Sequence, residues 1–569
     1  MPATACRTGA LLVFAGVVAL AMACGSGNSR AAQEPGGAGD GSNAPSGPAG
    51  GGGGGETPAP GSPRLDLACA ADSVTAGGNA VTCTAILHDA SGPVSWTLTG
   101  PGQLSAAAGD AIDYVPPASI SADAVAEIVA TAGTLSQSVQ IHVLAPAAPG
   151  PITLTGKVVD EYASPLEGET VLLDGHPAAT TDAAGAFTVD SVETPYDLVI
   201  PREGSRTAFI YQGLTRSDPT VFVYANETGD SGSAAQSTTL TGHVGGGDES
   251  EDDRDHYQAV LFASPQVDQG LRSYPPRVSL GELPDDYALP VSWHGSGATT
   301  GTLLAIQWRA DESTGAPTAY WYAVQEEVTL LPGESQANPA PLKLEANTEA
   351  VETKCTVRLP ANYDLLANYV GVSFPSRGIA FRLFRDDISA AGLATGEPYT
   401  TNYLLPSIPG ASVQVCAVAS DSRDYFAGST SVACADATGV SEVVIDVQRS
   451  LQPFSPARTA NDVTPAMRYA WSGFEGGVHM ARFTPLDEGA PRYYVFTAAT
   501  NAVLPDLSAQ KLGLPAGAQY EWDVRGTAPF ADLDAFTASA PVVPPFDFAI
   551  GTASRSAWSR STRYGFTTR

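Results

Sequence analysis

The sequence predicts an all-β protein built from tandem β-sandwich domains. The first observation is composition, because Gly 59 and Pro 44 in 569 residues suit many short strands joined by turns. The second is a regular alternation of apolar and polar residues in several short runs, which is typical of strands with one buried face. The third is length, since 569 residues exceed what a single hydrophobic core serves.

The N-terminus is predicted to direct export. Arg7 precedes the apolar run Ala10–Ala23, which is shorter than the roughly 20 residues of a membrane-spanning helix. A positive residue, a short apolar run and small residues before a cysteine are typical of a secretory signal, here residues 1–23. The stretch "LAMAC" resembles the lipobox of bacterial lipoproteins, which implies a lipid on Cys24. The alternative is an ordinary signal peptide cut near Ala23, which would give a freely secreted protein.

Residues 24–63 are predicted to be a disordered tether. They are almost all Gly, Ala, Ser and Pro, so they cannot bury enough apolar surface to offset the entropy of ordering. A flexible coil of this length spans about 35 Å r.m.s.. By the same resemblance, Gly25 after the cysteine favours the outer membrane or cell surface. We therefore expect an exported, lipid-anchored chain whose folded domains stand away from the membrane.

The chain is strongly acidic, with 29 Lys+Arg against 60 Asp+Glu and a net charge of −31. Such a surface repels phosphate backbones, so we expect no nucleic-acid partner. The sequence contains no H-E-x-x-H zinc motif, no G-x-S-x-G elbow and no P-loop. We therefore predict no catalytic residues and no cofactor other than weakly bound calcium. A triad assembled from distant loops would leave no such motif, so a hydrolase is the least favoured hypothesis.

Five cysteines follow the lipobox, and pairs are expected in an exported protein. Cys69 and Cys83 flank a turn between two predicted strands, and Cys416 and Cys434 flank a second loop of the same kind. Each disulfide would close a short loop and contribute roughly 3 kcal/mol in the chain-entropy model. Cys355 is left over, either as a buried thiol or as a competitor for Cys416.

Residues 64–146 are predicted to form the first sandwich. Val94, Trp96 and Leu98 alternate with other residues and share one strand face. Trp96 follows Cys83 at a spacing similar to that between the strand-B cysteine and the strand-C tryptophan of immunoglobulin domains. The stretch "SWTLTGPGQLSAAAGDAIDYVPPA" resembles a bacterial Ig-like domain, although the later cysteine of antibody domains is missing.

Residues 151–226 resemble a second family. "LTGKVVDEYASPLEGETVLLDG" followed by "TTDAAGAFTVDSVETPYDLVI" is similar to the carboxypeptidase regulatory-like domain, a transthyretin-like β-sandwich. The residues themselves also favour a β-sandwich here, because Pro165 and Gly168 favour a turn between strands and Gly185 can take a left-handed conformation without steric cost. In peptidases this domain accompanies a zinc catalytic domain, and the resemblance implies no catalytic residue within the domain itself.

Three further sandwiches are predicted, over residues 237–348, 351–450 and 451–569. "LTGKV" at Leu154–Val158 recurs as "LTGHV" at Leu240–Val244, which suggests a related sandwich there. The last block has the strand rhythm of an Ig-like or fibronectin type III-like fold. The arrangement as a whole resembles multidomain surface lipoproteins of myxobacteria.

Two stretches are candidate binding sites. The acidic run "GGGDESEDDRDHY" offers the oxygen ligands that calcium prefers, but it lacks EF-hand spacing, and a solvated loop is the favoured interpretation. The candidate calcium ligands are Asp248, Glu249, Glu251, Asp252, Asp253 and Asp255. A second, aromatic stretch could stack on sugar rings, although aromatic residues more often fill sandwich cores. The candidate glycan-stacking residues are Trp293, Trp308, Tyr320, Trp321 and Tyr322.

These observations favour a non-enzymatic, lipid-anchored cell-envelope protein that displays β-sandwich modules for binding or structural roles. The alternative is a carbohydrate-binding surface protein, and the third hypothesis is a hydrolase or peptidase-associated protein. The expected partners are the membrane, through the lipid, and a glycan or a surface protein. In a strand Tyr320 and Tyr322 share a face and Trp321 points the other way, so an exposed aromatic strip would favour the alternative.

Overall fold

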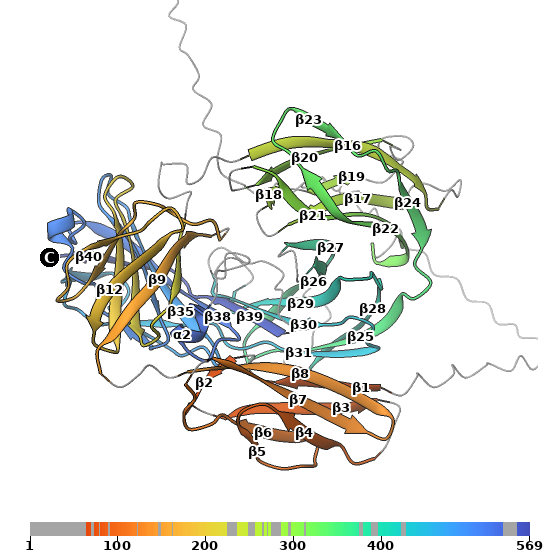
Figure 1. The fold of residues 1–569 in the computed structure, drawn as a ribbon, viewed down its shortest axis with the longest axis horizontal. Helices are drawn as coiled ribbons and strands as arrows, with labels where there is room; N and C mark the ends of the chain where they lie inside the picture. Colours follow the sequence, from red (N-terminus) through yellow and green to blue (C-terminus); the bar gives the residue numbers. More distant parts are fainter. Residues whose placement is uncertain are drawn as a thin grey trace, which may run out of the picture. The chain divides into compact units, whose positions relative to one another are not determined.

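A computed structural model gives the structure of the chain, and its described part confirms the predicted all-β class, with tandem β-sandwiches (Figure 1). Within that part, no helix is long and apolar enough to cross a membrane. The predicted signal peptide, the tether and Cys24 lie outside it. The described residues are 64–69, 73–78, 80–88, 92–121, 123–145, 150–161, 163–224, 236–248, 256–264, 267–269, 271–274, 286–293, 297–311, 315–374, 379–388, 397–422, 428–538 and 555–569.

The first sandwich covers residues 64–144. Its strands are β1 (Arg64–Cys69), β2 (Ser73–Thr75), β3 (Val81–His88), β4 (Ser95–Thr99), β5 (Gln103–Leu104), β6 (Ala111–Val115), β7 (Ala124–Ala132) and β8 (Leu135–Leu144). They form two sheets, ordered β1-β3-β6-β5 and β2-β8-β7-β4. On β4 the predicted alternation holds, because Trp96 is buried in a core with Cys83 while Ser95 and Thr97 are exposed. Two facing sheets around a tryptophan are the arrangement of an Ig-like domain.

The second sandwich covers residues 152–223. Its strands are β9 (Ile152–Asp160), β10 (Thr170–Leu173), β11 (Ala179–Thr180), β12 (Ala186–Val192), β13 (Tyr196–Arg202), β14 (Thr207–Leu214) and β15 (Thr220–Val223). One sheet is β12-β9-β15, and the other contains β11-β10-β13-β14. Gly185 has φ +71°, and a Cβ there would lie 2.4 Å from the carbonyl oxygen of Val158. The left-handed glycine that the sequence predicts is therefore required by a close backbone approach.

The third sandwich covers residues 236–346. Its strands are β16 (Gln236–Gly246), β17 (His256–Ala263), β18 (Val267–Gln269), β19 (Leu271–Tyr274), β20 (Asp286–Trp293), β21 (Thr299–Ala310), β22 (Pro317–Leu330), β23 (Ser335–Ala337) and β24 (Leu342–Ala346). They form one sheet, ordered β18-β20-β16-β24-β22-β21-β17-β19, with β23 beside β16. Leu240 and Leu289 from one half share a core with Phe262 and Leu303 from the other. The sheet therefore folds over into two packed layers.

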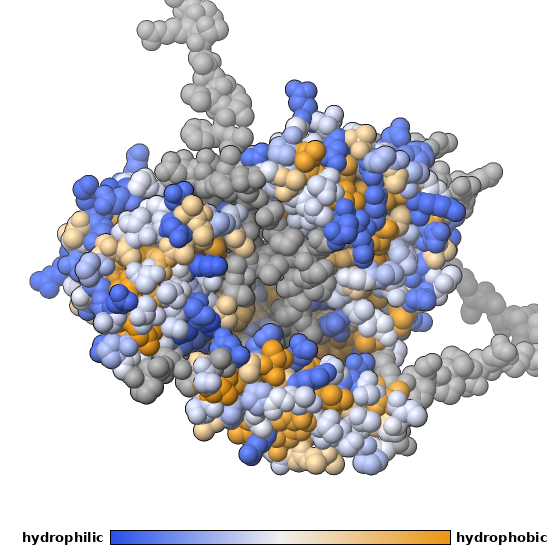
Figure 2. Space-filling model, in the orientation of Figure 1, coloured by the Kyte–Doolittle hydropathy of each residue, from blue (hydrophilic) through white to orange (hydrophobic). Residues whose placement is uncertain are grey.

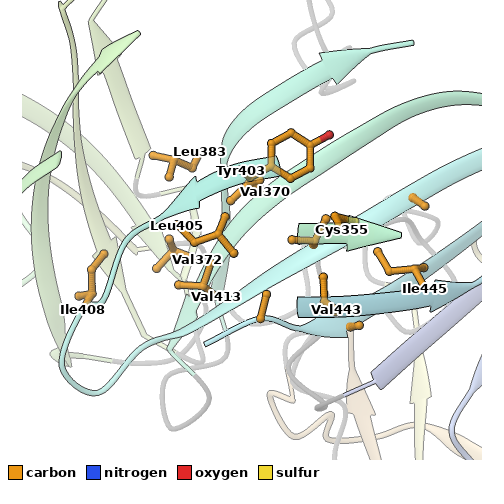
Figure 3. Close-up of a cluster of buried hydrophobic side chains, with 14 of the residues drawn as sticks. Cys355, Val370, Val372, Leu383, Tyr403, Leu405, Ile408, Val413, Val443 and Ile445 are labelled. Carbon is orange, nitrogen blue, oxygen red and sulfur yellow. The ribbon is translucent and has the colours of Figure 1, made fainter. Parts of the chain in front are cut away.

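The fourth sandwich covers residues 351–446. Its strands are β25 (Val351–Arg358), β26 (Asp364–Phe374), β27 (Ile379–Asp387), β28 (Tyr399–Leu405), β29 (Ser412–Ser420), β30 (Thr430–Asp436) and β31 (Glu442–Asp446). The sheet β28-β25-β31 faces the strands β27-β26-β29-β30. Figure 3 shows the core between them, where Cys355 and Val443 from the first sheet lie in one cluster with Val372 and Val413 from the second.

The fifth sandwich covers residues 453–568. Its elements are β32 (Pro453–Ser455), β33 (Ala460–Val463), β34 (Tyr469–Trp471), β35 (Val478–Pro485), β36 (Arg492–Thr497), β37 (Asn501–Ala502), the short 3₁₀ helix η4 (Ser508–Gln510), β38 (Gln519–Ala528), the one-turn helix α2 (Leu533–Phe536), β39 (Arg555–Arg560) and β40 (Tyr564–Thr568). Its core is aromatic, with Phe483 stacked on Trp522 at a centroid distance of 5.7 Å and Tyr520 stacked on Phe566 at 5.5 Å. Stacked rings of this kind contribute beyond the area they bury.

Hydrogen bonding joins the second, fourth and fifth sandwiches into one sheet. β14 pairs in parallel with β36, for example at Tyr211 and Phe496. β39 pairs with β38 on one side and with β30 on the other. The resulting sheet has 14 strands within the described residues. The predicted domain boundaries remain predictions, but backbone pairing crosses between the segments that they separate.

Two neighbouring strands of the third sandwich, β17 and β21, are buried on both faces. On β21, Leu303 packs into the core of the third sandwich, whereas the next residue, Leu304, packs into the core that contains Cys355. On β17, Val260 and Leu261 divide in the same way. Each strand therefore contains a continuous apolar stretch, "AVLFA" in β17 and "LLAI" in β21, whereas apolar and polar residues alternate in β4.

Candidate functional site

The first candidate site is the acidic run that begins at the end of β16, and Asp248 is the one of its six candidate calcium ligands that is described. Its carboxylate lies 2.8 Å from Nε2 of His256 and 3.5 Å from Nη1 of Arg309. Its backbone amide donates a hydrogen bond to Oε1 of Gln307 at 2.9 Å. A cation at Asp248 would compete with an imidazole and a guanidinium. The other predicted ligands lie outside the described residues: Glu249, Glu251, Asp252, Asp253 and Asp255.

The backbone turn before Asp248 depends on glycine. Gly247 has φ +91°, and a Cβ there would lie 2.2 Å from Oε1 of Gln307. Glycine is therefore needed both for the left-handed conformation and for the close approach that lets Gln307 accept from the Asp248 amide. Among the described residues, no group of three or more His, Cys, Asp or Glu side chains suits a metal ion. Calcium binding stays a prediction.

Three of the five candidate glycan-stacking residues are buried. Trp293, Trp308 and Tyr320 expose 1%, 8% and 2% of their surface. The hydroxyl of Tyr320 donates to the carbonyl oxygen of Leu404 at 2.8 Å, and Trp308 stacks on Tyr257 at 5.4 Å. These rings cannot offer a face to a sugar. For these three, the structure supports core packing, which was the favoured interpretation of the sequence.

The other two candidates, Trp321 and Tyr322, are half-buried. They point to opposite faces of β22, as alternation predicts, because Trp321 packs against the core of the third sandwich and Tyr322 packs beside Tyr320. Tyr322 also lines a groove of about 580 Å³, which is open to solvent. The groove residues are Tyr322, Ala323, Val324, Gln325, Glu326, Ala340, Pro341, Leu342, Lys343, Glu345 and Pro409.

The groove forms where two neighbouring strands diverge. β22 pairs with β24 at Trp321 with Ala346 and at Tyr322 with Glu345. From Leu344 back to Leu342, β24 pairs with β16 instead. The groove lies between these strands, since most of its lining residues come from β22 and from β24 with the residues just before it. Figure 2 shows hydrophilic residues and smaller apolar patches interspersed on the visible surface of the molecule.

The structure contains both disulfides that the sequence predicts. Cys69 and Cys83 lie directly opposite each other on β1 and β3, and Cys416 and Cys434 do so on β29 and β30. Cys355 is a free, buried thiol, and burial raises its pKa to about 12. It lies in the core between the two sheets of the fourth sandwich, whereas Cys416 belongs to a different cluster with Trp558. Cys355 therefore does not compete for Cys416.

The sequence analysis missed a buried polar network in the fourth sandwich. Tyr403 donates to the Asp386 carboxylate at 2.7 Å, and the side-chain amide of Asn368 donates to the Tyr403 hydroxyl at 3.0 Å. The pKa of Tyr403 is raised far above its usual value, mainly because the hydroxyl is buried and secondly because it donates a hydrogen bond to Asp386. The hydroxyl therefore stays protonated and ties β26, β27 and β28 together. The one signal in the sequence was Asn368, a polar residue inside the apolar run "LLANYVGV".

No protein-family model matches the chain, and the comparison with curated proteins gives no match either. Among solved structures, the Bacillus anthracis TIE protein is 9% identical, with 69% of this chain and 76% of that chain covered and a TM-score of 0.12. The four N-terminal Ig domains of Dscam1 isoform 8.4 are 9% identical, with 83% and 96% covered and a TM-score of 0.13. Elastase-activated Escherichia coli alpha-2-macroglobulin is 10% identical, with 89% and 53% covered and a TM-score of 0.16. Likenesses this low carry no argument about function.

Proposed function

We propose that this chain is a non-enzymatic, lipid-anchored cell-envelope protein that displays β-sandwich modules for binding or structural roles. The observation that carries the proposal is the pairing of β14 with β36 and of β39 with both β38 and β30, which joins three sandwiches into one sheet. Strand edges that are covered in this way are protected from pairing with other chains. Such protection suits a chain that presents several β-sandwiches to its surroundings without aggregating.

The cysteines support an exported protein. Four of them form two disulfides, which persist in oxidising compartments and are rare where thiols are kept reduced. The free thiol of Cys355 does not suit catalysis, because the thiolate is the nucleophile and burial raises the pKa of this group to about 12. Both observations fit a scaffold better than a thiol enzyme.

The anchor is proposed from the start of the sequence. Cys24 follows the short apolar run in a lipobox-like context, and residues 24–63 have the composition of a flexible spacer. We further assign residues 151–226 to the carboxypeptidase regulatory-like family. The assignment is supported by seven short strands in two sheets and by the left-handed Gly185 at the predicted turn.

Detergent partitioning tests the proposed anchor. The full chain, expressed in a bacterium that processes lipoproteins, should enter the detergent phase, and mass spectrometry should find a diacylglycerol on an N-terminal Cys24. The control is Cys24→Ser, which keeps the apolar run and removes only the sulfur that carries the lipid. This variant should lose the lipid mass and leave the detergent phase. An unmodified, water-soluble wild-type chain would contradict the proposal and favour a freely secreted protein.

A further inference from the structure

Among the described residues, no strand pairs with the outer edge of β22 over a short stretch beside the groove. The β22–β24 ladder ends at Tyr322, because β24 turns away to pair with β16. On its other side β22 remains paired with β21, at Ala323, Val324 and Gln325. The stretch ends near Glu327, which has φ +56° at an irregularity of the β21–β22 ladder. Within the described part of the chain, this stretch of β22 is therefore paired on one side and open on the other.

The burial of β22 fits a strand that lacks one neighbour. The five consecutive residues 321–325 are all half-buried, whereas Leu303, Leu304 and Ala305 on the adjacent β21 are fully buried. The side chains of this stretch pack alternately against the core of the third sandwich and against the core that contains Cys355, so both faces of the strand meet a core. Burial that is incomplete on both faces therefore fits a missing neighbour at the edge of the strand. An added strand beside β22 would cover the side chains on both faces of the strand at once.

The groove favours a basic occupant. Among its lining residues, the charged side chains are Glu326 on β22, Glu345 on β24 and Lys343, which gives a net charge of −1. Tyr322, Pro341 and Pro409 supply apolar walls. A second copy of this chain is disfavoured, because each copy carries a net charge of −31. Opposite charge steers a partner into such a site and fixes its register.

We propose that the open edge of β22, from Ala323 to Glu326, accepts an extended, basic peptide segment of a partner protein as an added strand. Main-chain hydrogen bonds to the strand edge would supply affinity, and alternate side chains would select the partner. The partner's apolar residues would contact Tyr322 and Pro409, and its basic residues would lie near Glu326 and Glu345. This proposal adds a partner to the display role above, and it does not depend on the lipid anchor.

The test uses a short fluorescent peptide of alternating lysine and valine as the probe, with the purified protein. Binding is measured by fluorescence anisotropy, and amide hydrogen exchange is followed along β22. The peptide should bind wild-type protein and slow exchange within residues 323–326. The double variant Glu326→Lys/Glu345→Lys should weaken binding by about tenfold or more, because it reverses both groove carboxylates.

Two controls separate strand addition from general charge attraction. The double variant Glu167→Lys/Glu193→Lys makes the same change in charge at exposed sites of the second sandwich and should bind like wild type. A peptide of alternating lysine and glycine has the same charge but low strand propensity, and it should bind more weakly. No binding of the lysine–valine peptide, equal loss in both variants, or unchanged exchange at 323–326 would each overturn the proposal. None of these results bears on detergent partitioning.

Discussion

His479 on β35 is a histidine that the fold holds in its neutral form. Its Nδ1 lies 2.9 Å from the carbonyl oxygen of Ala499, and its Nε2 accepts a hydrogen bond from the backbone amide of Phe474 at 3.2 Å. One nitrogen therefore donates and the other accepts, which a neutral imidazole can do and an imidazolium cannot. Burial lowers the pKa of His479 to about 4, although the hydrogen bond to Ala499 opposes this shift.

We predict that His479 makes the protein less stable in mild acid. Its pKa is near 6.5 in the unfolded chain and about 4 in the folded protein, so the unfolded state binds the proton first as the pH falls. The stability that the neutral form contributes is complete above pH 6.5 and declines below it, with a loss of about 2 kcal/mol at pH 5. Urea unfolding of wild type and of His479→Gln at pH 7 and pH 5 measures this difference.

The control for this prediction is His142→Gln, which removes an exposed histidine from β8. This variant should keep the wild-type difference in unfolding free energy between pH 7 and pH 5. The variant His479→Gln is expected to be less stable at pH 7, because glutamine fits the site less well, but its difference between the two pH values should be smaller. An equal pH dependence in wild type and His479→Gln would refute the role of this histidine.

At the scale of single elements, β4 and β21 show two ways in which a strand is buried. β4 has one covered face, so Trp96 is buried while Ser95 and Thr97 are exposed. β21 is covered on both sides, because Leu303 faces the third sandwich's core and Leu304 faces the core shared with the fourth. Two adjacent apolar residues of β21 are thus equally buried. In an isolated sandwich with one solvated face, one of these two side chains would be exposed to solvent.

We predict that Leu303→Ala and Leu304→Ala each destabilise the protein by about 2–5 kcal/mol, because both leucines are fully buried and each substitution leaves a cavity. If β21 had one solvated face, one of the two substitutions would be nearly neutral. The matched control is Val125→Ala on β7, where the side chain is 43% exposed. Urea unfolding monitored by tryptophan fluorescence measures all three. A neutral result for either leucine would contradict burial of that face.

The same elements show how much the sequence could predict. Alternation and turn residues identified the strand class, the two disulfides and the faces of β22, since these depend on neighbours close in sequence. The surroundings of each face depend on segments far away in the chain. The hydroxyl of Tyr320 donates a hydrogen bond to the carbonyl oxygen of Leu404 in the fourth sandwich. The residues next to Tyr320 in the sequence do not predict that contact. The groove beside β22 was missed for the same reason, because it requires β24 to leave β22 and join β16.

At the scale of the whole molecule, one C-terminal strand links two sandwiches that the sequence separates. β39 pairs with β38 of the fifth sandwich through Thr527 and Trp558, and with β30 of the fourth through Val432 and Trp558. The indole of Trp558 packs in a cluster with the Cys416–Cys434 disulfide. The fourth sandwich therefore uses residues near the C-terminus both in its backbone pairing and in the apolar cluster around its disulfide, which is separate from the core that contains Cys355.

We predict that Trp558→Ala weakens the coupling between these two sandwiches. The lost packing of a buried tryptophan should cost about 3–5 kcal/mol, and the fourth sandwich should bear this cost although the substitution lies in the fifth-sandwich sequence. Calorimetry should show the melting of the fourth sandwich at lower temperature. Hydrogen exchange should rise first on β30, at Thr430 to Ala435, where β39 pairs.

The control for Trp558→Ala is Arg563→Ala, which changes an exposed residue after β39. This variant should leave the melting temperature of the fourth sandwich and the exchange rates on β30 unchanged. If exchange rose on β38 while β30 kept its protection, β39 would belong to the fifth sandwich alone, and the sheet would not couple the two.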